Sequence, residues 1–231
     1  PDDGEVLTGG NFHGQPLALA LDMLAVTLAH IASFAERRTY SLMGPHDWDT
    51  GPNAVPLFLT PQPGLSSGYM IAQYAAAALV NEIKLLAHPA SVDSIPTSAG
   101  MEDFVSMGAT AAIKARQALE LTWRVVAIEL IAACQALEFR LPLRSGGGVN
   151  AAYEAVRALV PALAADRPPA PDIERLARAL SDGLLEGVVP EDALAADPAL
   201  HPLADHGPAN GKGGGRRRAR QTADREGRGR H

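Results

Sequence analysis

Apolar residues dominate three long stretches of the chain, and polar segments rich in proline and glycine separate them. The stretches cover about residues 15–43, 69–87 and 108–139. Alanine and leucine are frequent in all three, and both favour helix, while small side chains let helix axes approach closely. Pro16 stands at the start of the first stretch, where proline is tolerated in a helix. The pattern predicts an all-α fold, a closely packed bundle of long helices.

The first stretch is apolar on nearly every side, which is typical of a helix in the centre of a bundle. Residues 17–35 are also long enough to raise the question of a membrane span. They include Asp22 and His30, however, and they lack the basic flanks and interfacial tryptophans of such spans. We therefore expect a central bundle helix and no membrane partner.

Two long connections and two shorter helices complete the predicted organisation. Residues 44–68 are rich in proline and glycine, and residues 90–107 form a second, polar loop; loops of this length inside a compact chain are usually functional. Shorter helices are predicted over 151–160 and 172–182. We expect residues 1–189 to form one helical portion and residues 190–231 to form a disordered basic tail.

Charge and cysteine content limit the binding partners and the cellular compartment that we expect for this protein. The 231 residues carry a formal net charge of -6. Residues 211–231 hold eight basic and two acidic side chains, a net +6, so the first 210 residues carry -12 and give no electrostatic reason to bind nucleic acid. The tail alone could bind it, but we expect a disordered extension rather than a nucleic-acid arm. The single cysteine, Cys134, excludes a disulfide scaffold and favours a reducing compartment, the cytoplasm. The acidic N-terminus does not resemble a signal peptide.

Standard catalytic signatures are absent from the sequence, and its seven histidines show no ligand spacing, so we expect no metal site. The polar loop 91–107 has two interpretations. Residues 98–103 are able to cap the next helix, since Ser and Asp side chains satisfy free amides there. Alternatively the loop binds a ligand or acts in catalysis: Glu102 has Met101 and Phe104 nearby, and apolar surroundings raise the pKa of a carboxylate used in acid–base chemistry.

A second candidate is the turn Asn11-Phe12-His13-Gly14 before the first helix. Its simpler interpretation is an N-cap by Asn11, with Phe12 as a hydrophobic staple. Neither of these two segments identifies a reaction by itself.

Several motifs in collinear order give a more specific signal. They are Gly10-Asn11-Phe12-His13-Gly14-Gln15-Pro16-Leu17-Ala18, Ser67-Gly68-Tyr69-Met70-Ile71-Ala72-Gln73, Ala90-Ser91-Val92-Asp93-Ser94-Ile95-Pro96-Thr97-Ser98, Glu102-Asp103 and Val105-Ser106-Met107-Gly108. Over about residues 4–185 the chain resembles the C-terminal half of the aromatic amino acid lyase family, in particular its histidine ammonia-lyase branch.

The resemblance implies a long-helix bundle that assembles as a homotetramer with active sites shared between subunits. It implies elimination of ammonia, for L-histidine giving trans-urocanate, the first step of histidine catabolism. The family's electrophile is 4-methylideneimidazol-5-one (MIO), which forms from an internal Ala-Ser-Gly. A strong electrophile is needed because the β-proton is weakly acidic and the amine leaves poorly.

The resemblance assigns two residues of this chain to the substrate pocket. Phe12 would form a wall of the aromatic-ring pocket, and Glu102 would hold the imidazole or amino group and manage a proton there, which makes it the catalytic candidate. The phenylalanine and tyrosine lyases typically carry Gln at the position of Glu102, so a carboxylate argues for histidine. Met101 stands where many relatives have Gln, and Phe104 where many have His.

The chain departs from the family in one decisive respect, because it contains no Ala-Ser-Gly. We expect a fragment that lacks the electrophile-forming half, in agreement with the missing initiator Met, and we expect the isolated chain to be inactive. Two alternatives remain. One is a tyrosine or phenylalanine ammonia-lyase, or an aminomutase, of the same family; the other is a non-catalytic helical remnant.

Overall fold

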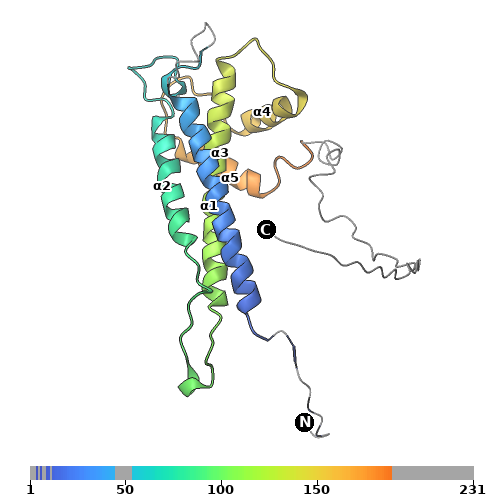
Figure 1. The fold of residues 1–231 in the computed structure, drawn as a ribbon. Helices are drawn as coiled ribbons and strands as arrows, with labels where there is room; N and C mark the ends of the chain where they lie inside the picture. Colours follow the sequence, from blue (N-terminus) through green and yellow to red (C-terminus); the bar gives the residue numbers. More distant parts are fainter. Residues whose placement is uncertain (1–3, 5, 7–8, 11, 45–53, 189–231) are drawn as a thin grey trace, which may run out of the picture. The chain divides into compact units, whose positions relative to one another are not determined.

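The computed structural model describes residues 4, 6, 9–10, 12–44 and 54–188, which form helices joined by loops (Figure 1). The helices are α1 Gln15–Met43, α2 Met70–Leu86, α3 Gly108–Glu138, α4 Gly147–Leu159 and α5 Ala170–Ser181, with 3-10 turns η1 Leu57–Leu59 and η2 Ser98–Gly100. The described part shows no strand, only two isolated bridges. The all-α prediction is confirmed. The tail predicted from residue 190 onward lies outside the described residues.

The three long helices begin and end within about one residue of their predicted bounds, but α4 begins four residues earlier than expected. The prediction treated Gly146, Gly147 and Gly148 as a break. Instead Gly146 is the N-cap and the two following glycines lie in the first turn, where the amide of Asn150 donates to the carbonyl of Gly146 (2.9 Å). Glycine costs least in a first turn, because the amide groups there have no partner within the helix.

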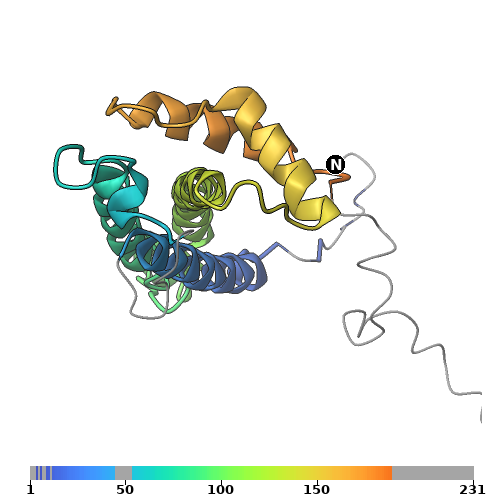
Figure 2. The same cartoon turned by 90° about the horizontal axis from the view of Figure 1, so that it is seen from above.

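Helix α3 occupies the centre of the molecule (Figure 2), with α1 and α2 on one side and α4 and α5 on the other. The prediction that the first helix is central is wrong. Helix α1 buries one face, through residues such as Ala25, Ala32 and Ala35, and exposes apolar side chains on the other, including Met23 (72%) and Phe34 (63%). The hydropathy of a helix indicates how much of its surface favours burial, but it does not say which chain buries that surface.

By length and composition alone α1 would suffice to cross a membrane. Its buried face, however, carries two carboxylates, Asp22 and Glu36, which are 5% and 4% exposed. Glu36 accepts hydrogen bonds from Arg37 (2.5 Å) and from the side chain of Gln73 on α2 (2.8 Å). Buried charges are tolerated where they are paired and hydrogen-bonded. We therefore interpret α1 as a bundle helix.

Polar contacts hold the second layer and its connections against the long helices. Arg124 on α3 pairs with Glu174 on α5 (2.6 Å). The buried side chain of Gln135 accepts a hydrogen bond from the amide of Leu163 (3.0 Å) and donates one to the carbonyl of Leu163 (3.3 Å). The connection between α4 and α5 is thereby fixed to the C-terminal end of α3.

The loop between α2 and α3 extends beyond the end of the bundle (Figure 1) and is anchored at its start by α1. Its Ser91 amide donates to Asp22 Oδ2 (2.7 Å), and Gln15 Nε2 donates to the Ser91 carbonyl (3.1 Å). Burial raises the pKa of Asp22, but hydrogen bonds from Ser91 and the positive charge of Lys114 outweigh it and hold this pKa below its usual value. The backbone amide and carbonyl of one loop residue, Ser91, are thus both held by side chains of the same helix.

We expect Asp22→Ala to lower the free energy of unfolding by about 1–3 kcal/mol at neutral pH, because the Ser91 amide loses its buried acceptor. Since the pKa of Asp22 is lower in the folded than in the unfolded chain, its contribution is present above the unfolded value and is lost as the pH falls through the folded one. Urea unfolding at several pH values measures both effects, with the exposed Asp93→Ala as control. Equal stabilities for the two variants at neutral pH would contradict this contribution of Asp22.

Candidate functional site

The structure brings the two predicted site segments together through His13 and Phe104. Nε2 of His13 lies 2.9 Å from the carbonyl oxygen of Phe104, and their rings stack with centroids 5.8 Å apart. On its other side the His13 ring meets the edge of Phe12 at 6.3 Å. The segment that carries Phe12 and the loop that carries Glu102 are therefore in contact, although 91 residues separate His13 from Phe104.

Helix α1 fixes the protonation pattern of this histidine. The backbone amide of Gln15 donates to Nδ1 of His13 (3.3 Å), so Nδ1 carries no proton and Nε2–H is the donor to Phe104. The same contact satisfies one of the amides that the start of a helix leaves without a partner. Both ring nitrogens of His13 are thus in use.

Glu102 lies in a tight turn at the outer end of the loop. Its backbone pairs in both directions with Thr97, at 2.9 and 3.3 Å, across η2. Within the turn Ser98 and Ala99 have left-handed backbone angles, with φ of 52° and 55°. Such angles are costly for residues other than glycine and persist where the surroundings impose them.

The capping interpretation of residues 98–103 is wrong. The N-cap of α3 is Met107, which makes no side-chain cap bond, and Ser98 lies in η2. Likewise α1 begins after Gly14, again without a side-chain cap, while Asn11 lies outside the described residues. Phe12 is 91% exposed and therefore does not form the expected hydrophobic staple.

The side chains around the two candidates are uncovered in this chain. Met101 is 89% and Phe104 48% exposed, and Glu102 itself is exposed, so the apolar enclosure expected around its carboxylate is not formed by these residues. The arrangement is an exposed cluster of the Phe12, His13 and Phe104 rings, in which Phe104 lies on the loop that also carries the exposed Glu102.

Close approach of the two helix starts makes this arrangement possible. A Cβ on Gly14 would stand 2.9 Å from Oγ of Ser106, so a larger residue there would displace the Ser106 side chain where the start of α1 lies against the residues before α3. Just inside, Ala18, Ala90 and Ala111 form a small buried cluster. Small residues at these positions set the separation of the segments that carry Phe12 and Phe104.

Sequence reasoning placed His13 in a candidate turn and Gln15 and Ser91 in the collinear motifs but assigned none of them a connecting role, and it saw in Asp22 only an argument against a membrane span. A signal was present: Gln15 and Asp22 are seven residues apart, so they lie on the same face of α1. Their common partner, Ser91, is more than sixty residues away and is identified only by the structure.

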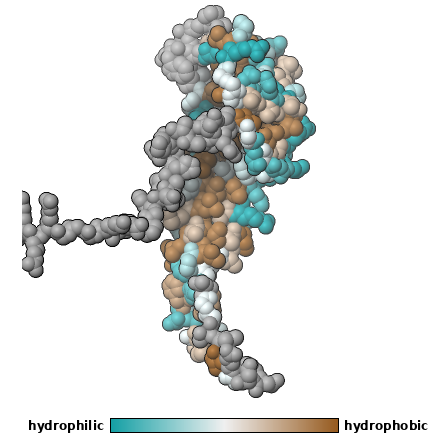
Figure 3. Space-filling view, turned by 90° about the vertical axis from the view of Figure 1, so that its right-hand side faces the viewer, coloured by the Kyte–Doolittle hydropathy of each residue, from teal (hydrophilic) through white to brown (hydrophobic). Residues whose placement is uncertain are grey.

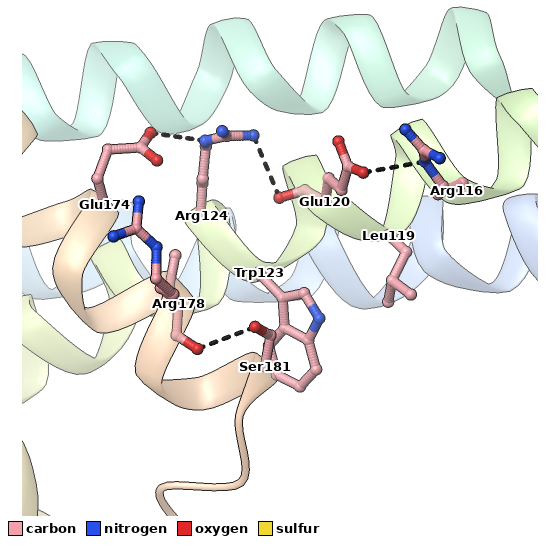
Figure 4. Close-up of a pocket in the computed structure, with 9 residues that line it drawn as sticks. Arg116, Leu119, Glu120, Trp123, Arg124, Glu174, Arg178 and Ser181 are labelled. Carbon is pink, nitrogen blue, oxygen red and sulfur yellow. Dashed lines mark hydrogen bonds and ion pairs between the residues drawn. The ribbon is translucent and has the colours of Figure 1, made fainter.

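The described residues contain no group of three or more histidine, cysteine, aspartate or glutamate side chains that could hold a metal ion. A separate groove of about 400 Å³ lies between α3 and α5 (Figure 4). Arg116 and Arg124 line it, but they pair with Glu120 (3.2 Å) and Glu174 (2.6 Å). Neither helix carries Phe12 or Glu102, so the groove is separate from the candidate site.

Comparison with known proteins identifies the family. Residues 1–158 match the family model described as aromatic amino acid lyase. The chain is 54% identical over 186 residues to a histidine ammonia-lyase of Anaeromyxobacter dehalogenans, covering 80% of this chain and 36% of the relative. It is 52% identical over 203 residues to that of Deinococcus radiodurans, covering 87% and 38%.

Solved structures agree with this result. A histidine ammonia-lyase from Trypanosoma cruzi matches with a TM-score of 0.72 and 41% identity, covering 82% of this chain and 37% of that one. A tyrosine aminomutase from Streptomyces globisporus matches with a TM-score of 0.73 and 38% identity, covering 81% and 35%. The chain thus spans little more than a third of the length of these relatives, and it belongs to the aromatic amino acid lyase family.

Proposed function

We propose that this chain is the C-terminal portion of an ammonia-lyase that converts L-histidine to trans-urocanate in histidine catabolism. The contact of His13 with Phe104 carries the proposal, because it joins the segment that holds Phe12 to the loop that holds Glu102. The names of the relatives that are 52–54% identical support histidine as the substrate. A carboxylate at Glu102 suits a basic imidazole.

The chain's own residues bind and orient rather than supply the electrophile. MIO, when present, withdraws electrons from the substrate so that the β-proton and the amine can leave. It forms from Ala-Ser-Gly, which this sequence does not contain, so residues outside the chain must provide it. The exposed Phe12 ring fits a wall against the imidazole, and the exposed Glu102 carboxylate fits a partner for the imidazole or the amino group.

We expect the 231-residue chain alone to show no histidine turnover, followed by urocanate absorbance. Fusing the N-terminal part of the Deinococcus radiodurans enzyme upstream of this chain supplies the missing half and should restore turnover. Release of urocanate by the chain alone would contradict the proposal. A folded but inactive fusion would favour the non-catalytic remnant.

A second candidate chemistry is supported by the aminomutase structures, whose identity to this chain (38%) is close to that of the Trypanosoma cruzi lyase (41%). An aminomutase returns the amine to the substrate instead of releasing it. The same fusion, given histidine, tyrosine or phenylalanine, separates the candidates by its products: free ammonia and an unsaturated acid, or a β-amino acid.

In the active fusion we expect Glu102→Gln to reduce histidine turnover by roughly 30- to 1000-fold, equivalent to about 2–4 kcal/mol of transition-state stabilisation. The change is nearly isosteric but removes the charge and the proton acceptor. The melting temperature should barely change, because Glu102 bonds Thr97 through its backbone. Asp103→Asn, the exposed neighbour, is the control, and unchanged turnover with a lowered melting temperature would make Glu102 structural.

We further propose that the protein acts in the cytoplasm as a homotetramer. The exposed face of α1 supports assembly: a space-filling view shows hydrophobic side chains gathered along the lower part of the bundle (Figure 3). On α1 the exposed apolar side chains include Leu17 (69%), Met23 and Phe34. A continuous apolar surface of this kind normally marks an interface. Cys134 is buried and unpaired, as expected in a reducing compartment.

We expect the chain to sediment as an oligomer at micromolar concentration, because association covers the apolar face of α1. Met23→Glu places a charge on that face and should shift the population toward smaller species. Glu120→Gln on the exposed surface of α3 is the control. A well-behaved monomer of the unmodified chain would contradict the assembly.

A further inference from the structure

We propose that His13 is a positioning residue: it holds the Glu102 turn at the start of α1, and through that turn it sets the place of the Glu102 carboxylate. The inference rests on the proposed function for its kinetic consequence, but the contacts that carry it belong to this chain alone.

A continuous chain of hydrogen bonds crosses the site with His13 near one end. Asp22 accepts from the amide of Ser91, the Ser91 carbonyl accepts from the side chain of Gln15, the Gln15 amide donates to His13, and His13 donates to the carbonyl of Phe104. Gln15 and His13 thus attach the beginning and the end of one loop to the same helix start. The imidazole suits this place because it accepts at one nitrogen and donates at the other.

The outer part of the loop depends on this attachment. Its internal bonds, between Thr97 and Glu102 and from the Val105 amide to Oγ of Ser94 (3.1 Å), join its two limbs to each other. Among the described residues, the bond from His13 to Phe104 is the hydrogen bond that joins residues 92–106 to α1 or to the segment before it. Residues 92–104 are exposed, so packing within the chain does not replace it.

Contacts of the His13 ring with two aromatic rings also orient the attachment of the loop. The imidazole stacks on Phe104 with an interplanar angle of 30° and meets Phe12 at 83°. One side chain therefore contacts both the proposed aromatic wall and the limb that leads to Glu102. Loss of the His13 side chain frees the turn that carries Glu102. The backbone of this turn is strained at Ser98 and Ala99, so the turn relaxes when the attachment is lost.

A purely structural alternative exists, because the bond from the Gln15 amide to Nδ1 also serves the start of α1. If that were the whole role of His13, its substitutions would lower stability without changing the kinetics of folded molecules. Three variants separate the two roles. His13→Phe keeps a ring for stacking but no hydrogen bond, His13→Asn keeps an acceptor near Nδ1, and His13→Gln keeps a donor near Nε2.

The first test uses the 231-residue chain and does not depend on activity. Imidazole 15N chemical shifts should show His13 with the proton on Nε2. Amide hydrogen exchange at Thr97 and Glu102 should be faster in His13→Phe than in the unmodified chain. In His13→Gln it should be slower than in His13→Phe. A proton on Nδ1, or unchanged exchange in His13→Phe, would overturn the proposal.

The second test uses the active fusion. His13→Phe should lower kcat/KM for histidine about tenfold, as expected for a lost hydrogen bond in a binding site, and His13→Gln should recover most of it. In a Glu102→Gln background the further effect of His13→Phe should vanish, because His13 acts through Glu102. His88→Phe, an exposed histidine at the start of the same loop, is the matched control.

Equal losses in both backgrounds, or a lower melting temperature with unchanged kinetics, would make His13 structural. An inactive fusion refutes the proposed function instead, and the shifts and exchange rates of the first test then decide the attachment by themselves.

Discussion

The close packing of α1 against α3 is the constraint on which the rest of the molecule depends. Alanines fill the contact: Ala18, Ala32 and Ala35 on α1 and Ala111 and Ala118 on α3 are fully buried. Side chains this small allow the helix axes to approach closely. The approach continues to the ends of the helices, where Gly14 lies against Ser106. Without it, His13 and Phe104 would be out of reach of each other.

An interface made of alanine provides little to fix the register of two helices, since one small side chain packs much like the next. The ion pair between Arg38 on α1 and Glu129 on α3 joins these two helices, and buried polar groups fix the segments that pack around them. Asp22 is matched to Ser91, Glu36 to Gln73, and Gln135 to Leu163. Each of these groups is costly to bury without its partner, so a shift by one turn would leave several of them unpaired. One of these groups, Asp22, also anchors the loop that carries Glu102.

The exposed features of the chain have a common physical explanation. Helix α1 leaves one apolar face uncovered, and the loop leaves Met101, Phe104 and the Phe12 ring uncovered. Both surfaces are more apolar than solvent exposure favours. Relatives more than twice as long match this chain over about 36% of their length. Under the proposed function, further polypeptide covers these surfaces and the active site is completed from several segments.

The sequence by itself determined the helical fold, the bounds of the long helices and the family, because apolar periodicity and collinear motifs are local properties of the chain. Glu102 and Phe12 were found through that resemblance, and their roles stay predictions. Only the tertiary structure decided that α3 and not α1 is central, that residues 98–103 form a strained turn rather than a cap, and that His13 joins the two site segments. These features depend on contacts between residues far apart in the chain, such as the 91 residues between His13 and Phe104, and no local pattern encodes which partner a buried amide or an imidazole will meet.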